Sequence, residues 1–231
     1  MKHFTTLSLV LLFTASPLLM NAQDCDIYQE FREGTTTKMV HYDQKDKITG
    51  ITTTTIKEKN NLPNGVSVRV HQLFDDTEEY TFESEFTMEC RDGVTTVDME
   101  KFIDPNSLSA YENMEIEVEA DNIPLPSNAK PGDALEGGSV TVRINTGTPV
   151  KVTMTVEITN RKVESREKVE TPAGTFDCLK ITYDMLSKIG FVKIQGSTAE
   201  YYNSKVGVVR SESFNKKGKL TGYTVLEEIN N

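Results

Sequence analysis

The chain has 231 residues, with 25 lysines and arginines against 35 aspartates and glutamates, and a formal net charge of −10 at pH 7. Its cations, Arg161 and Lys162 among them, are interleaved with carboxylates, whereas nucleic acids and anionic membrane surfaces attract clustered lysine and arginine. The composition therefore argues against both as partners, and the length is sufficient to bury a sizeable core within one domain.

The first 22 residues have the pattern of a secretory signal peptide. Lys2 precedes an apolar run from Leu7 to Leu19, which is too short to span a bilayer, and the small residue Ala22 stands before the expected cleavage site. A buried core helix or a membrane anchor is the alternative interpretation. We expect residues 1–22 to be a removable signal peptide.

The remaining residues, 23–231, are expected to form a single β-rich domain that is exported and not transmembrane. The periplasm and the outer surface or extracellular space are both open. A lipoprotein signal would place small residues directly before Cys25, but Gln23 and Asp24 precede it.

Three cysteines remain after removal of the leader: Cys25, Cys90 and Cys178. An oxidising compartment permits one internal disulfide and leaves one thiol. All three pairings are open, and we favour Cys25 with Cys90 because Cys90 lies on the apolar face of its predicted strand. No Cys-x-x-Cys motif and no neighbouring histidine indicates redox chemistry.

Apolar and polar residues alternate with period two along most of the mature chain, which is typical of antiparallel strands with one wet and one apolar face. Turn residues separate these runs at hairpin spacing, for example at Arg91-Asp92-Gly93. The apolar positions of the three longest runs are Tyr80, Phe82, Phe86, Met88 and Cys90; Met114, Ile116, Val118 and Ala120; and Val150, Val152, Met154, Val156 and Ile158.

Two segments interrupt the alternation. Asp104-Pro105-Asn106-Ser107 has the N-cap and the first-turn proline of a helix, which predicts one short helix inserted between strands. The stretch from Asn122 to Gly138 contains three prolines, so we expect a long loop there rather than a paired strand. That loop is either a rim over an apolar cavity or a plain crossover. The predicted fold is therefore mainly β, a curved antiparallel meander with one helix insert.

Four sets of short motifs carry a family resemblance: Cys25 to Tyr28; Tyr42 to Gly50; Cys90-Arg91-Asp92-Gly93 with Asp98-Met99; and Val169 to Cys178 with Gly207-Val208-Val209. They resemble the TapB-like group of secreted Bacteroidetes proteins, a family of unknown function. The resemblance covers essentially the whole mature chain and implies an envelope address and a curved sheet similar to a lipoprotein-carrier half-barrel, but no reaction and no catalytic residue.

The sequence contains no motif for catalysis. His41 and His71, the histidines outside the leader, are expected to be solvated, and no serine-nucleophile elbow, zinc helix or phosphate-binding glycine loop occurs. The acidic run Asp75 to Glu79 lacks the glycine and the spacing of a calcium loop. We therefore expect no enzyme activity, no metal and no cofactor.

The apolar face of the sheet is the remaining candidate site. A curved sheet either packs on its own segments or encloses an apolar guest. We predict a non-catalytic envelope protein that binds a lipid or another apolar small molecule, with a protein-interaction or structural module as the alternative, using a strand edge or the proline loop. The predicted ligand-lining residues are Tyr80, Phe82, Phe86, Met88 and Met154.

Overall fold

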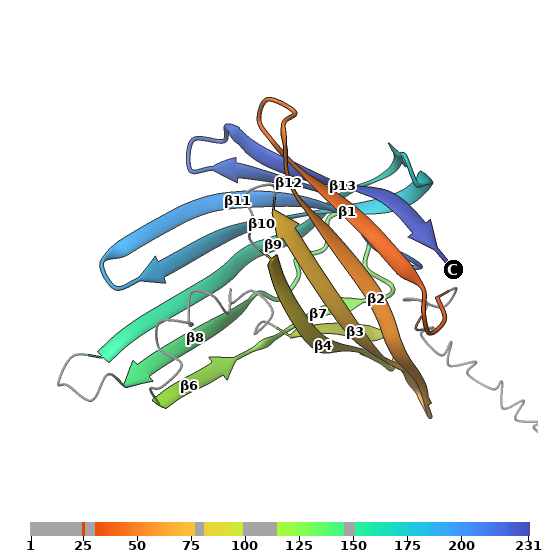
Figure 1. The fold of residues 1–231 in the computed structure, drawn as a ribbon, viewed down its shortest axis with the longest axis horizontal. Helices are drawn as coiled ribbons and strands as arrows, with labels where there is room; N and C mark the ends of the chain where they lie inside the picture. Colours follow the sequence, from red (N-terminus) through yellow and green to blue (C-terminus); the bar gives the residue numbers. More distant parts are fainter. Residues whose placement is uncertain (1–24, 26–30, 77–80, 99–114, 146–150) are drawn as a thin grey trace, which may run out of the picture.

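The computed structural model describes residues 25, 31–76, 81–98, 115–145 and 151–231 (Figure 1), and these contain strands but no helix. The predicted signal peptide and the predicted helix at Asp104 lie outside the described residues. The strands are β1 (Thr36–Asp43), β2 (Ile48–Leu62), β3 (Gly65–Asp76), β4 (Thr81–Arg91), β5 (Val94–Asp98), β6 (Glu115–Ala120), β7 (Asn122–Pro126), β8 (Gly138–Asn145), β9 (Lys151–Thr171), β10 (Gly174–Ile189), β11 (Val192–Asn203), β12 (Gly207–Asn215) and β13 (Leu220–Asn230).

All thirteen strands belong to one antiparallel sheet in the order β6-β8-β9-β10-β11-β12-β13-β1-β2-β3-β4-β5-β7. Two meanders, β1 to β5 and β8 to β13, account for most of this order. They are joined where the first strand pairs with the last, from Thr36 opposite Asn230 to Asp43 opposite Gly222. The predicted curved antiparallel meander is confirmed.

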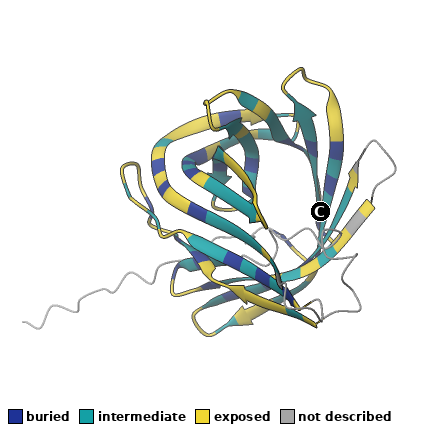
Figure 2. Cartoon of the chain, turned by 90° about the vertical axis from the view of Figure 1, so that its left-hand side faces the viewer, coloured by how far each residue is buried: buried dark blue, intermediate teal, exposed yellow. Residues whose placement is uncertain are grey.

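The sheet curls until its two edges approach one another. Strands β6 and β7 stand at opposite ends of the strand order, yet only Asp121 separates them in the chain. The Asp121 amide donates to the Ser139 carbonyl oxygen (2.8 Å), which ties this crossing to β8. The result is a nearly closed barrel with a seam, more closed than the expected half-barrel, and Figure 2 shows the sheet curving round on itself.

The expectation that the prolines after Asn122 prevent strand pairing is wrong for β7. Pro124 pairs with Thr96, and Pro126 pairs with Val94 of β5. Residues two apart in a strand direct their backbone groups to the same edge, so both proline nitrogens can face away from β5, and an edge strand tolerates proline there. The Pro124 carbonyl oxygen also accepts a bond from Arg161 of β9, across the seam.

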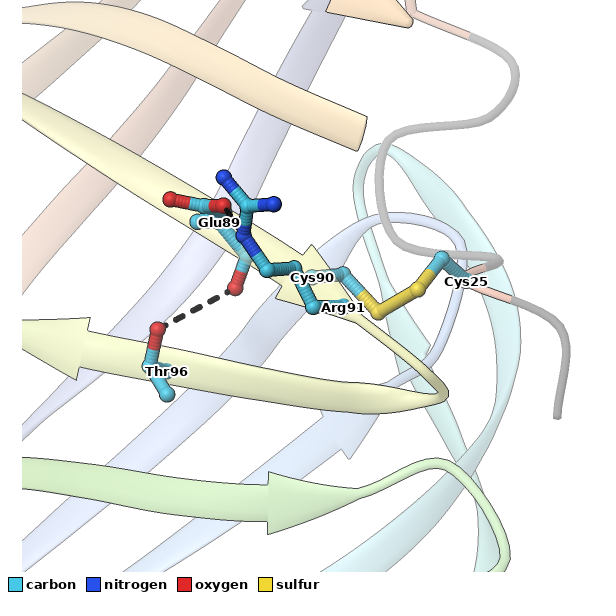
Figure 3. Close-up of a disulfide and its surroundings, with 5 residues drawn as sticks. All are labelled: Cys25, Glu89, Cys90, Arg91 and Thr96. Carbon is cyan, nitrogen blue, oxygen red and sulfur yellow. Dashed lines mark hydrogen bonds and ion pairs between the residues drawn. A yellow bond between two sulfur atoms is a disulfide. The ribbon is translucent and has the colours of Figure 1, made fainter. Parts of the chain in front are cut away.

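A disulfide joins Cys25 to Cys90 across a sequence separation of 65 residues. Cys90 ends the alternating run of β4 and is 1% exposed, within a cluster that includes Val68, Val70 and Phe31. Figure 3 shows the disulfide beside β4, with the Arg91 side chain turned toward Glu89 in an ion pair. Cys25 is thereby fixed to the end of β4.

The third cysteine, Cys178 of β10, is a fully buried free thiol in a cluster with Val169, Val209 and Leu226. Burial, with smaller contributions from the carboxylates of Asp177 and Glu167, raises its pKa to about 11. Since the thiolate is the reactive form, this thiol is inert at neutral pH.

Candidate functional site: an internal cavity

The interior of the barrel contains a cavity of about 450 Å³, within the size range of small-molecule pockets. Strands from both meanders contribute to its wall, including β1, β2, β4, β9, β10 and β11. The apolar side chains that line it are Phe31, Met39, Ile56, Phe86, Met88, Ile123, Leu125, Ile158, Ile181, Val206, Val208 and Leu226, and the hydroxyl-bearing ones are Thr35, Thr37, Thr52, Thr54, Thr95, Tyr183, Tyr202, Ser211 and Thr224.

A second hollow of about 250 Å³ adjoins the first. The two share Thr95, Leu125 and Tyr202 in their walls. The smaller hollow lies near the disulfide, because Cys90 also lines it.

A β-bulge in β9 places an arginine in the cavity wall. Asn160 and Arg161 both stand opposite Tyr183, between the pairs Thr159 with Asp184 and Lys162 with Thr182, and Asn160 has a positive φ of 53°. The extra residue reverses the alternation of the strand. Arg161, which the sequence analysis counted among the cations interleaved with carboxylates, therefore points inward and is only 9% exposed.

Arg161 connects three segments around the seam. Its Nη1 donates to the carbonyl oxygens of Pro124 (2.9 Å) and Glu136 (2.7 Å). Burial lowers the pKa of the guanidinium from its ordinary value, while the Glu200 carboxylate and Tyr183 act to raise it. An arginine remains charged even under such a shift, so the cavity wall carries a cation balanced by the carboxylate of Glu200.

The Tyr183 hydroxyl donates to Oε1 of Glu200 at 2.9 Å. Burial, followed by the charge of Glu200, raises the pKa of Tyr183 well above its ordinary value. The phenol therefore stays protonated and keeps donating to the carboxylate. Arg161, Tyr183 and Glu200 form a polar group in one region of a wall that is otherwise largely apolar.

His41 belongs to a second polar region, formed by β1, β2 and β13. Its Nε2 lies 2.7 Å from the Thr52 hydroxyl and its Nδ1 lies 3.1 Å from the Thr224 hydroxyl. The ring also contacts Phe74 edge to face, with centroids 5.4 Å apart. The expectation of a solvated His41 is wrong, because the alternation of β1 turns it toward the interior with Thr37 and Met39.

Burial lowers the pKa of His41 below its ordinary value of 6.5, which makes stability depend on pH. Between the two pKa values the unfolded chain binds more protons than the folded chain. The contribution of neutral His41 is therefore complete above the unfolded pKa and is lost as the pH falls through and below 6.5.

We expect the free energy of unfolding to decrease between about pH 7 and pH 5, and His41→Gln to flatten this slope. Urea unfolding at a series of pH values measures the effect. His71→Gln is the matched control, since His71 is paired with Glu83 at 3.4 Å outside the cavity. An equal slope in the wild type and in His41→Gln would contradict the assignment.

The predicted lining residues are distributed unevenly. Phe86 and Met88, both on β4, line the cavity. Met154 is half-buried on β9 but does not contribute to this wall. Tyr80 lies outside the described residues, as does the side chain of Phe82.

The sequence reasoning missed Arg161, Tyr183, Glu200 and His41. A signal for Arg161 was present: the apolar positions of β9 are even-numbered up to Ile158, and the next apolar residue is the odd-numbered Val163. Such a change of phase within one strand marks a bulge, and it reverses which residues face the core.

The polar groups of the cavity are engaged with one another rather than arranged around a vacant reaction centre. Both nitrogens of His41 have threonine partners, and Glu200 accepts from Tyr183. Within the described ranges no cluster of histidine, cysteine, aspartate and glutamate has the geometry to hold a metal ion. The arrangement is suited to holding a molecule that is apolar over most of its surface.

The chain belongs to the DUF3108-like family, whose model matches residues 32–226. It is similar to the crystal structure of a candidate exported protein with a YmcC-like fold from Bacteroides fragilis, with a TM-score of 0.70 and 25% identity over 87% of this chain and 97% of that one. A candidate lipoprotein from Parabacteroides distasonis is equally similar, with a TM-score of 0.70 and 25% identity over 86% of this chain and 96% of that one. None of the curated proteins compared with the chain matches it.

These comparisons confirm the YmcC-like, nearly all-β fold and the exported location of the protein in the envelope. The match is to the DUF3108-like model rather than to the TapB-like group named from the sequence motifs. In the part of the chain that the structure describes, no helix has the length and hydropathy to cross a bilayer.

Proposed function

We propose that the protein is a non-catalytic envelope protein that holds an uncharged amphiphilic molecule, such as a neutral lipid, in its internal cavity. The observation that carries this proposal is the cavity of about 450 Å³ between the two meanders. The TapB-like resemblance and the removal of residues 1–22 are parts of the same proposal.

The apolar lining supports a guest with a hydrocarbon body. Phe86 and Met88 from β4 and Ile123 and Leu125 from β7 contribute to the wall. Methionine and aromatic side chains adapt to irregular apolar shapes. Apolar area removed from water contributes roughly 25 cal/mol per Å² to the affinity.

The charges in the wall support an uncharged guest. The Arg161 cation is balanced by Glu200, and the lowered pKa of His41 keeps the imidazole neutral at pH 7. A guest with its own charge would leave one of these groups without compensation, at a large cost in a buried site. The threonine hydroxyls and Gln72 offer hydrogen bonds to a hydroxyl or ester group of the guest.

Filling the cavity tests the proposal. Thr54→Phe places a ring in the space lined by Thr52, Thr54 and Ile56, and we expect it to weaken binding of the apolar dye N-phenyl-1-naphthylamine by about tenfold or more, the equivalent of ~1.4 kcal/mol. Dye fluorescence titration measures the affinity. Thr53→Phe is the control, because Thr53 lies on the opposite face of the same strand and should leave binding unchanged.

Failure of the wild-type protein to bind the dye, or equal binding by both variants, would contradict a ligand-binding cavity. Circular dichroism and the urea midpoint of each variant establish that the barrel is folded. Loss of binding in Thr53→Phe as well as in Thr54→Phe would show that the dye binds elsewhere.

A protein-interaction role is the second candidate, and an edge strand favours it. Within the described residues β6 pairs only with β8, and Val118 is 39% exposed. A free strand edge can accept a strand from a partner. The segment after β7 is less suited to this, since the Gly132 amide donates to Val163 and the Val163 amide donates to Asp133. Crosslinking in cells that recovers no partner through β6 would count against this role.

A further inference from the structure

The end of the β10–β11 hairpin carries four of the six large apolar side chains that are exposed in the described part of the chain. Phe191 is 106% exposed, Val192 and Ile194 are each 60% exposed, and Ile189 is 43% exposed. We call residues 185–196 the tongue. In Figure 1 the tongue projects at the left-hand side of the barrel.

The exposed apolar residues share one face of the tongue. Ile189 stands opposite Val192, and Ile194 stands opposite Ser187, in a β10–β11 register without irregularities. The cavity-lining residues of β10, Ile181 and Tyr183, are odd-numbered like Ile189. Those of β11, Glu200 and Tyr202, are even-numbered like Val192 and Ile194. Because alternate residues share a face of a strand, the apolar face of the tongue continues the cavity wall.

The other face of the tongue is basic near its tip. Lys188 and Lys193 form a directly opposed cross-strand pair. Lys188 donates to Glu157 at 2.6 Å, while Lys193 is exposed. From Val192 to Gln195 the strand lies beyond its pairing with β12, which begins at Gly196. On its other side the tongue stays paired with β9 up to Ile189 opposite Met154. Only the β11 edge of the tip is therefore unpaired, with Gly190 and Phe191 at the turn.

We propose that the tongue docks on a lipid membrane, with Phe191, Val192 and Ile194 inserted among the acyl chains and Lys193 at the level of the phosphate groups. Interfacial elements combine an exposed apolar face with flanking cations in this way. The acidic remainder of the chain, with a net charge of −10, opposes attraction by an anionic surface, so insertion of the apolar side chains has to supply the affinity.

Docking of the tongue does not require an occupied cavity. Together with the proposed function, however, it defines a route by which a lipid reaches the cavity. The shared face leads from the tip of the tongue along Met185 and Ser187 to Tyr183 in the cavity wall. A neutral lipid that leaves the bilayer at Phe191 would follow one continuous side of the hairpin into the barrel.

Vesicle flotation with the exported form of the protein, purified after secretion, tests the proposal. We expect the wild type to float with vesicles of phosphatidylcholine, and Phe191→Asp to lower its partition coefficient by about tenfold or more, because burial of a phenylalanine is lost and a charge is added. Ile48→Asp is the matched control, since Ile48 is 42% exposed on β2, away from the tongue. It should float like the wild type.

Replacing part of the phosphatidylcholine by phosphatidylglycerol tests the role of Lys193. Lys193→Glu should weaken flotation on these vesicles several-fold more than on neutral ones, through loss of one cation near the phosphates. A wild type that does not float, equal flotation of Phe191→Asp, or equal loss in Ile48→Asp would overturn the proposal. So would a dimer that Phe191→Asp converts to a monomer, which would make a second copy the occupant.

The flotation experiment and the dye-binding experiment on the cavity can fail independently. Phe191 is not a lining residue, so Phe191→Asp should bind N-phenyl-1-naphthylamine as the wild type does. Lost flotation with retained dye binding supports docking by the tongue. Lost dye binding with retained flotation would count against both assignments, because it would couple Phe191 to the cavity and not to the membrane.

Discussion

Arg161→Met is expected to lower the free energy of unfolding by about 3–6 kcal/mol, the combined contribution of two hydrogen bonds from a charged donor. The guanidinium joins β9 to the carbonyl oxygens of Pro124 and Glu136 at the seam. Without it, these carbonyls lose their donor and Glu200 loses its counter-charge. The loss is a large fraction of the total stability of a domain, which is about 5–15 kcal/mol.

Urea denaturation measures the change as a shift of the midpoint at constant m-value. Arg166→Met on the same strand is the control, because Arg166 is half exposed and pairs with Asp177 at 3.6 Å, so its removal should cost less than about 1 kcal/mol. Adding Glu200→Gln to Arg161→Met should restore part of the stability. Equal losses of stability in Arg161→Met and Arg166→Met would contradict the inference that Arg161 holds the two sides of the seam together.

Cys25→Ala is expected to cost roughly 4 kcal/mol, from the loss of a crosslink that closes a 65-residue separation. Without the disulfide the unfolded chain has a higher conformational entropy, which favours unfolding. The substitution leaves the packing of Cys90, which is 1% exposed, largely in place, so the effect comes mainly from the crosslink.

Thermal or urea unfolding with and without dithiothreitol provides the measurement. The wild type should lose stability under reducing conditions, and Cys25→Ala should be insensitive to the reductant. Insensitivity of the wild type would show that Cys25 and Cys90 are not joined in solution. Alkylation of Cys178, with its pKa of about 11, should remain slow in both proteins until they unfold.

The strands and their faces are predictable from the sequence because period-two alternation survives through most of the chain. The runs that contain Val68 and Val70, Phe86 and Met88, and Ile158 all occur as strands with these side chains inward. The tight turns are predictable for the same local reason. The Asp43 carboxylate accepts from the amides of Lys45 and Lys47, and the Asn215 amide oxygen accepts from Lys217 and Lys219 in an equivalent hairpin.

The closure of the barrel and the polar groups of the cavity depend on long-range pairing, which alternation does not encode. That β7 can be an edge strand despite Pro124 and Pro126 follows only once its partner, β5, is known. Arg161 points inward because of a single extra residue at Asn160. His41 is half-buried because its side of β1 becomes the inner face once β2 and β13 pair with β1. The exposed tip at Phe191 is a turn that extends beyond the end of β12, which pairs with β11 only from Gly196.

Native mass spectrometry of the exported protein, purified gently from the envelope and compared with its denatured mass, tests the central claim most directly. The account predicts extra mass that is lost on denaturation, from an uncharged amphiphile small enough for a cavity of about 450 Å³, and predicts that Thr54→Phe does not carry it. A bare protein mass in the wild type under these conditions would contradict a ligand-holding role. It would favour the second candidate function, protein interaction through the edge of β6.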